Sequence, residues 1–202
     1  MVKQKSFTIA ITGASGVQYG IRLLQCLLQA KQRVYLLISD PAKVVIATET
    51  QFKLPSDSSA IAQFFCREFS VNESLLSVFN KNQWMAPVAS GSNPTDAMII
   101  CPCSTGTLSA ISVGSSRSLI ERAADVMLKE GRKLILVPRE APYSSIHLEN
   151  MLKLSKLGVS IIPASPAFYH RPETITQLID TIVARILDHL AIPHNLVQRW
   201  GE

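Results

Sequence analysis

Residues 7–28, FTIAITGASGVQYGIRLLQCLL, decide the fold of this chain. The first of them, residues 7–12, are mostly apolar or β-branched, which favours a buried strand. Gly13 and Gly16 then indicate a tight turn, because glycine adopts backbone angles that other residues avoid. The apolar side chains that follow recur at the spacing of an amphipathic helix: Val17, Ile21, Leu24 and Leu28. The stretch therefore predicts a strand, a turn and a helix.

Strand and helix signals continue to alternate along the chain. The other predicted strands cover residues 34–38, 97–101, 133–137 and 159–162. Two further helices are predicted to end near residues 49 and 114. Three more are predicted over residues 119–129, 145–157 and 175–190. Such alternation predicts a three-layer, Rossmann-like (flavodoxin-like) α/β fold, with helices on both faces of a parallel sheet and ligands at the carboxyl ends of its strands. The length of 202 residues suits one such domain, residues 1–202.

Local signals predict how some of these elements begin and end. We expect Asp40 to cap a helix that has Pro41 at its first position, and Gly158 to end another helix in the left-handed conformation. Residues 50–91 are the least regular part of the sequence. A polar break at residues 56–59 and a short helix near residues 73–79 are predicted there.

Composition narrows the classes of function. The formal net charge of +5 comes from scattered Lys and Arg residues, with no polybasic tail and no repeat of basic and aromatic residues. This pattern favours anionic small molecules over nucleic acid as ligands. Apolar runs are too short for a membrane span, and the first residues lack the order of a secretory signal. We therefore expect a cytoplasmic protein with four reduced cysteines.

The turn after the first strand is a candidate ligand site. Its glycines would let the backbone approach a ligand, and the helix start would offer free N–H groups to an anionic or electron-rich group. An ordinary tight turn explains the same glycines. A nicotinamide-binding turn is a further alternative, and Asp40 lies where a ribose-binding acid is expected. Against it, Gly13, Gly16 and Gly20 do not form G-x-G-x-x-G, and no Tyr-x-x-x-Lys pair is present.

Two further strand ends carry polar side chains. Residues 101–107, CPCSTGT, place hydroxyls and a glycine before a helix, which suits phosphate oxygens or a polar ring edge. Cys101 and Cys103 lack the partner ligands of a zinc site, so we expect packing residues and no metal. Arg139 and Glu140 follow another strand, where Arg suits phosphate binding and Glu can move a proton. A solvated surface ion pair is the alternative.

Other basic side chains are weaker candidates. Arg185 borders the apolar stripe of the last helix and is expected to need an anionic partner. Arg122 and Lys129 are seven residues apart and share a helix face, which a solvated basic surface explains equally well. His170 on its own indicates a structural histidine.

Five sequence blocks together resemble the flavin prenyltransferase family of UbiX type. They are GASG at 13–16, CSTGT at 103–107, IERAAD at 120–125, VPREAP at 137–142 and FYHRP at 168–172. The likeness covers residues 6–201 and is weakest over residues 50–82. It implies a transferase that joins the dimethylallyl group of dimethylallyl phosphate to N5 and C6 of reduced FMN, without a metal.

The resemblance also assigns roles to residues. Those implied for flavin binding are Gly13, Ala14, Ser15, Ser39, Ser104, Thr105, Gly106, Thr107 and Arg139. Those implied to hold dimethylallyl phosphate or lie beside it are Ser90, Arg122, Lys129, Arg139, Glu140, Tyr169 and Arg185. Catalytic roles are implied for Ser15 at the flavin N5, for Glu49 and Glu140 in proton movement, and for Trp84 as a wall of the prenyl pocket, where its face would stabilise a passing cation.

The resemblance further implies partners. A homododecamer with sites at subunit contacts is expected, with Lys129 a candidate for the pocket of a neighbouring subunit. The product, prenylated FMN, would serve a partner decarboxylase of ubiquinone-type biosynthesis. Three other functions stay open at this point: an FMN-binding carrier module without catalysis, a flavin-dependent decarboxylase that acts directly on an aromatic acid, and a nicotinamide-dependent reductase.

Overall fold

A computed structural model describes residues 4–199 and 201. Its centre is a six-stranded sheet in which every strand is parallel to its neighbours. The strands are β1 (Ser6–Ile11), β2 (Arg33–Ile38), β3 (Leu76–Phe79), β4 (Ala97–Cys103), β5 (Lys133–Pro138) and β6 (Ser160–Ile161). Their order across the sheet is β3-β2-β1-β4-β5-β6. This is the doubly wound Rossmann order, which reverses direction between β1 and β4. The predicted α/β class is confirmed.

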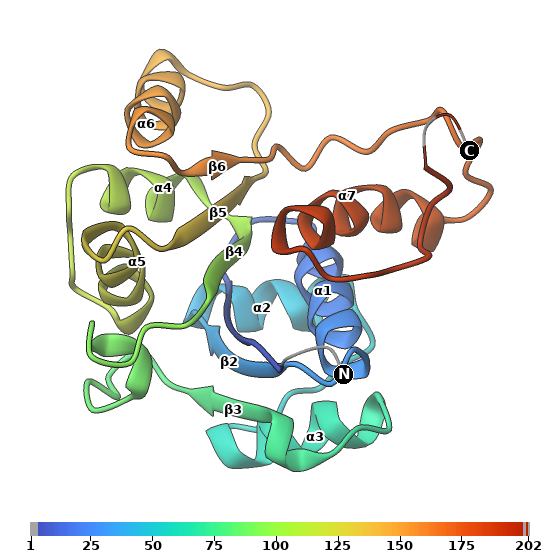
Figure 1. Cartoon of the computed structure of the whole chain (residues 1–202), viewed down its shortest axis with the longest axis horizontal. Coiled ribbons are helices and arrows are strands. Elements are labelled where there is room, and N and C mark those ends of the chain that lie inside the picture. Colours follow the sequence, from blue (N-terminus) through green and yellow to red (C-terminus); the bar gives the residue numbers. More distant parts are fainter. Residues whose placement is uncertain (1–3, 200, 202) are drawn as a thin grey trace.

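Helices cover both faces of the sheet (Figure 1). On one face, the helices that share an apolar core with β1 and β2 are α1 (Val17–Gln29), α2 (Asp40–Glu49), α3 (Ser58–Glu68) and α7 (Ile175–Leu190). On the other face lie α4 (Thr105–Ser112), α5 (Leu119–Lys129) and α6 (Ser145–Lys156). The central strands are buried on both sides, which explains their nearly continuous apolar sequences. None of the helices in the described residues is long and apolar enough to span a membrane.

The irregular segment 50–91 differs from its prediction in two ways. The polar residues 56–59 begin α3, because the Asp57 carboxylate accepts a hydrogen bond from the Ala60 nitrogen at 3.0 Å and caps the helix. The predicted short helix near residues 73–79 is confirmed only at its start, and residues 76–79 form a strand. A 3₁₀ helix, η1 (Glu73–Leu75), is followed by the edge strand β3, whose Leu76 lies opposite Val34 of β2. A second 3₁₀ helix, η2 (Pro87–Ala89), lies before β4.

Most other boundaries agree with the sequence to within two residues. The predicted strand 97–101 extends to Cys103, and β6 is shorter than predicted. Gly158 has φ +85° just after the end of α6, as expected for a left-handed helix end.

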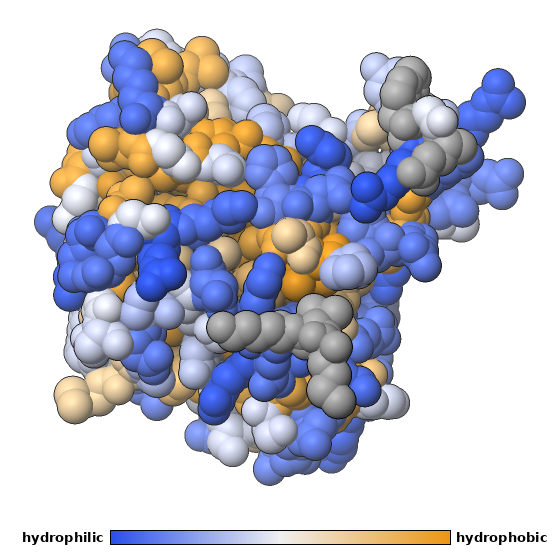
Figure 2. Space-filling view, viewed as in Figure 1, coloured by the Kyte–Doolittle hydropathy of each residue, from blue (hydrophilic) through white to orange (hydrophobic). Residues whose placement is uncertain are grey.

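One helix leaves apolar side chains in contact with solvent. Of the residues in α6, only Leu154 is buried, whereas Ile146, Leu148 and Leu152 are each more than half exposed. Apolar residues gather over the end of the molecule that carries α6 (Figure 2). The three exposed side chains Ile146, Leu148 and Leu152 belong to this end.

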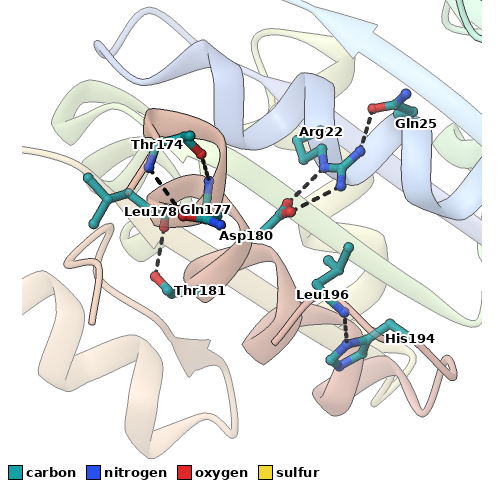
Figure 3. Close-up of polar contacts among 9 residues, drawn as sticks. All are labelled: Arg22, Gln25, Thr174, Gln177, Leu178, Asp180, Thr181, His194 and Leu196. Atoms are coloured by element: carbon teal, nitrogen blue, oxygen red, sulfur yellow. Dashed lines mark hydrogen bonds and ion pairs between the residues drawn. The ribbon is translucent and has the colours of Figure 1, made fainter. Parts of the chain in front are cut away.

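A partly buried ion pair joins the first and last helices. Arg22 of α1 donates to the Asp180 carboxylate of α7 through Nε at 2.7 Å and through Nη2 at 3.0 Å (Figure 3). Such a two-point contact fixes orientation as well as distance. The next residue of α7, Thr181, accepts a hydrogen bond on Oγ1 from the Ala167 nitrogen at 3.2 Å. One turn of α7 therefore holds both α1 and the segment that leads to Tyr169.

Candidate active site

The turn between β1 and α1 packs directly on the start of α2. Gly16 has φ +95°, in the left-handed region that favours glycine, and it precedes the first residue of α1. A Cβ added at Gly13 would lie only 2.5 Å from the Cβ of Pro41. The segments that follow the carboxyl ends of β1 and β2 therefore meet here, and the contact is possible because position 13 is glycine.

The start of α1 already holds a carboxylate of the protein. Glu49, at the end of α2, accepts hydrogen bonds on Oε2 from the nitrogens of Gly16 at 2.8 Å and Val17 at 3.4 Å. The expectation that these N–H groups are free for a ligand is therefore wrong. A negative charge is favourable at a helix N-terminus, and Glu49 supplies it.

The end of β4 is tied to the end of β1 by Thr12. The Thr12 Oγ1 donates to the Pro102 carbonyl at 2.8 Å and accepts from the Ser104 nitrogen at 2.8 Å. Ser104 in turn caps α4, since its Oγ accepts from the Thr107 nitrogen at 3.3 Å. Sequence reasoning missed Thr12, although a polar residue at the end of an apolar strand was the available signal.

Ser39 at the end of β2 caps α2. Its Oγ accepts a hydrogen bond from the Ala42 nitrogen at 3.2 Å. The predicted cap, Asp40, is wrong: it is the first residue of the helix, and its carboxylate pairs with Lys81 and Lys43. The hydrogen bond from Lys81, followed by the attraction of its charge, lowers the pKa of Asp40.

A pocket of about 370 Å³ opens at this edge of the sheet. Four of the predicted flavin residues line it: Gly13, Ser39, Ser104 and Thr107. The remaining lining residues are Asp40, Pro41, Lys81, Ser118, Ile120 and Glu121. We call this cavity the switch-point pocket, because it lies where the strand order reverses. Lys81, its only basic side chain among the described residues, was not predicted, since it follows β3 in the segment that the sequence left unassigned.

Arg139 connects the end of β5 to the same region. Its Nε donates to the Ser15 carbonyl at 3.1 Å. The next residue, Glu140, accepts a hydrogen bond on its carboxylate from the Ala141 nitrogen at 3.1 Å. Tyr143 also lies close: partial burial raises the pKa of its hydroxyl, and the Glu140 charge raises it further. Arg139 and Glu140 thus lie at the border of the site, as predicted for the end of β5.

The other predicted flavin residues lie in the two turns that border the switch-point pocket. Ala14 is buried, and its nitrogen bonds to the Thr12 carbonyl at 2.8 Å. Thr105 and Gly106 form the first turn of α4. A Cβ added at Gly106 would meet no atom within 4 Å, so this glycine is not required by packing within the chain.

The predicted basic face of α5 forms a second group. Arg122 donates through Nε to the Ala89 carbonyl at 3.0 Å and through Nη1 to Asp125 at 2.7 Å. Lys129 pairs with Glu130 and lies beside Gly91. Both cations therefore contact the loop that contains Ser90, and both already have a carboxylate partner. Ser90 itself bonds to Ser92, with 2.9 Å between their hydroxyl oxygens.

The remaining predicted residues lie elsewhere on the chain. Trp84 is 46% exposed and lines a pocket with Phe79 and Met85. Tyr169 is 78% exposed and lines a different pocket with residues 170–172 and part of α7. Arg185 is exposed and pairs with Asp188 at 3.3 Å, so its expected anionic partner is present. A single chain thus brings together the flavin residues but not the whole set predicted for the prenyl phosphate.

The cysteines have no features of a reactive or metal-binding group. Cys101 and Cys103 are fully buried, and burial raises the pKa of both thiols, that of Cys103 to about 12. None of the four cysteines forms a disulfide. Over the part of the chain that the structure describes, no group of three or more His, Cys, Asp or Glu side chains is placed to hold a metal ion.

Comparison with known proteins places this arrangement in a family. The sequence model of the Flavoprotein family matches residues 1–190. The protein named Flavin prenyltransferase UbiX from Pseudomonas aeruginosa is 57% identical over 195 residues, which is 96% of this chain and 93% of that protein.

Solved structures give the same result. AnUbiX in complex with FMN and dimethylallyl pyrophosphate is 39% identical, with a TM-score of 0.87 and 99% of each chain covered. A dodecameric FMN-dependent UbiX-like decarboxylase from Escherichia coli O157:H7 is 40% identical, with a TM-score of 0.85, and covers 98% of this chain and 100% of its own. The chain belongs to the Flavoprotein family and, within it, to the flavin prenyltransferases of UbiX type.

Proposed function

We propose that this protein joins the dimethylallyl group of dimethylallyl phosphate to N5 and C6 of reduced FMN. The observation that carries the proposal is the arrangement where the strand order reverses. Four predicted flavin residues line one pocket there, and Arg139 bonds to the turn at Ser15. Doubly wound sheets bind their ligands at this place. The complex of AnUbiX with FMN and dimethylallyl pyrophosphate supports FMN and a dimethylallyl ester of phosphate as the class of ligands.

The residues around the switch-point pocket suit FMN. The Ser39 Oγ accepts its capping hydrogen bond, which leaves its hydroxyl hydrogen for a ligand oxygen. Gly13 keeps the floor of the pocket free of a side chain. Arg139 would lie against the ring, beside the Ser15 carbonyl to which it bonds. Reduced FMN supplies the nucleophilic ring atoms, and these residues hold and orient it.

The prenyl phosphate needs groups that this chain does not gather alone. Arg122 and Lys129 lie on α5, Tyr169 precedes α7, and Arg185 lies within α7. A homododecamer in which a neighbouring copy supplies Lys129 and Arg122 would complete the site. The dodecameric Escherichia coli relative supports this assembly. The apolar residues that gather over the end of the molecule carrying α6 (Figure 2) support it too, because an exposed apolar patch commonly marks an interaction site.

The proposed reaction makes two bonds. As the first forms between N5 and the prenyl C1′, the bond from C1′ to the phosphate oxygen breaks. The second forms between C6 and C3′ as the C2′=C3′ double bond opens. C2′ takes up a proton, C6 loses one, and N5 loses its own proton when the first bond forms. Arg139 and the other cations would stabilise the leaving phosphate, whose charge grows in the transition state. Glu140 and Glu49 are the proposed groups for proton movement, and Ser15 would orient N5. Trp84 and Ser90 would wall the prenyl pocket.

The wider role is part of the same proposal. Prenylated FMN has no use within this chain's own reaction and would pass to a partner decarboxylase of ubiquinone-type biosynthesis, in the cytoplasm. Transfer of the product to apo-decarboxylase, followed as recovery of decarboxylation, tests that role.

Direct decarboxylation is a second candidate. The Escherichia coli relative is described as an FMN-dependent decarboxylase, and it shares 40% of its sequence with this chain. This candidate predicts that the purified protein with FMN releases carbon dioxide from an aromatic acid with no other enzyme present. A pure carrier of FMN would do neither reaction.

One experiment separates these functions. The protein is incubated anaerobically with FMN, a reductant and dimethylallyl phosphate, and the flavin is then analysed by mass spectrometry. Prenyl transfer predicts a flavin heavier by one five-carbon unit and an equal amount of released phosphate. An unchanged flavin mass, with FMN bound, would rule out prenyl transfer, and the carbon dioxide assay would then separate the decarboxylase from the carrier.

A further inference from the structure

Lys81 has a place in the switch-point pocket that the proposed reaction does not use. Its Nζ lies 2.5 Å from the Asp40 Oδ2, and both side chains are about half exposed. The other acid of the lining, Glu121, is turned to its own loop, where it accepts hydrogen bonds from Ser115 Oγ at 2.7 Å and from the Arg117 nitrogen at 2.8 Å. Lys81 is thus the cation that faces a ligand in this pocket.

The pocket has a direction. Arg139 and Ser15 mark one border of the region, at the ends of β5 and β1. Lys81 and Ser118 lie on the side formed by the β3 connection and the start of α5. The lining between them is small or hydroxyl-bearing: Gly13, Ser39, Ser104 and Thr107. A flavin whose ring lies at Arg139 would therefore extend its ribityl chain toward Lys81.

We infer that Lys81 binds the phosphate of FMN and makes the site select FMN over flavins that lack this group. The inference rests on the proposed function, because it takes the switch-point pocket as the FMN site. An ammonium group has three donors, so Lys81 can keep Asp40 as a partner and still donate to a phosphate oxygen. Asp40 then holds the ammonium at the pocket and does not itself contact the ligand.

Two neighbouring contacts support this role. The Lys81 carbonyl accepts a hydrogen bond from the Leu119 nitrogen at 3.1 Å, which anchors its backbone to the start of α5. Lys43 lies 3.7 Å from Asp40 but does not line the pocket. Lys43 thus pairs with the same carboxylate without lining the pocket, and it offers a matched control.

The test compares two flavins that differ by the phosphate alone. Dissociation constants of FMN and riboflavin are measured by fluorescence titration for the unmodified protein and for Lys81→Ala, Lys81→Arg and Lys43→Ala. We expect Lys81→Ala to weaken FMN binding about tenfold and to leave riboflavin within twofold, as for loss of one charged contact at a half-exposed site. Lys81→Arg should keep most of the preference, and Lys43→Ala should keep all of it. The effect of Lys81→Ala should shrink as salt rises.

Other outcomes would overturn the inference. Equal losses for FMN and riboflavin would give Lys81 a structural role, and no loss for either would remove it from the site. In both cases the unmodified protein would still bind FMN and prenylate it, so the proposed function would stand. If the unmodified protein binds no FMN, both proposals fall together.

Discussion

The Oε2 atom of Glu49 lies 2.8 Å from the backbone nitrogen of Gly16, so the last residue of α2 caps the first turn of α1. The two residues are far apart in sequence, and their contact closes the turn that carries Ser15. A residue that the family resemblance marks as catalytic therefore also has a structural task.

Substitutions at Glu49 should separate these two tasks. Glu49→Ala removes the acceptor of two helix N–H groups, and we expect the free energy of unfolding to fall by about 1 kcal/mol. Glu49→Gln keeps an acceptor without the charge, so its loss should be smaller. Urea titration measures both. If Glu49→Gln then prenylates FMN as fast as the unmodified protein, Glu49 has only the structural task.

Substitutions at Arg139 and Glu140 should impair the reaction in different ways. Arg139→Ala removes the hydrogen bond to the Ser15 carbonyl and should weaken FMN binding about tenfold, the usual range for a charge-assisted hydrogen bond. Glu140→Gln should leave FMN binding within twofold and slow a single turnover at least tenfold, because a neutral amide cannot accept the proton. Equilibrium titration and rapid-quench kinetics give the two readouts. Full single-turnover rates in both variants would contradict the site assignment.

Gly13 should tolerate no side chain. A Cβ there would lie 2.5 Å from the Cβ of Pro41, so Gly13→Ala must displace the start of α2, at a cost of about 1–3 kcal/mol in stability. The shift would also change the lining of the switch-point pocket. Gly106→Ala is the matched control for stability, since its Cβ meets nothing within 4 Å. Equal thermal stability of the two variants would show that the start of α2 can move without lowering the stability of the fold.

The fold was predictable where one local pattern was sufficient. The spacing of apolar residues predicted α1 and α7, and continuous apolar runs predicted β1, β2, β4 and β5. The four residues of β3 are too few for a period to be visible, and they become a strand because β2 offers an open edge. Ser58 and its neighbours look like a break, yet they start a helix because Asp57 caps it.

The site was predictable only in part for a related reason. Ser104 and Arg139 each follow a strand, so the rule that ligands bind at strand ends was sufficient to select them, whereas Ser39 came from the family resemblance. Lys81 has no such signal, because the strand that it follows, β3, is not visible in the sequence. Thr12 follows β1 and fits the rule, but its role comes from partners that are distant in sequence. Trp84, Tyr169 and Arg185 lie at separate places on one chain, and a local sequence pattern does not show whether they belong to one site.

Alkaline pH should destabilise the protein partly through Cys103. Burial raises the pKa of its thiol from the ordinary 9.0 to about 12, so between these values the unfolded chain loses a proton that the folded chain keeps. The free energy of unfolding should therefore fall as pH rises through this window, by up to about 1.4 kcal/mol per pH unit for this thiol. Cys103→Ala should make that slope shallower, as measured by urea titration at several pH values. An unchanged slope would mean that Cys103 titrates equally in both states.

The position of bound FMN tests the central claim most directly, and a crystal structure of the complex measures it. We predict that the ribityl phosphate occupies the switch-point pocket beside Ser39 and Ser104, with the ring next to Ser15 and Arg139. An FMN molecule bound in the Tyr169 pocket, or anywhere away from the carboxyl ends of β1 and β4, would contradict the account.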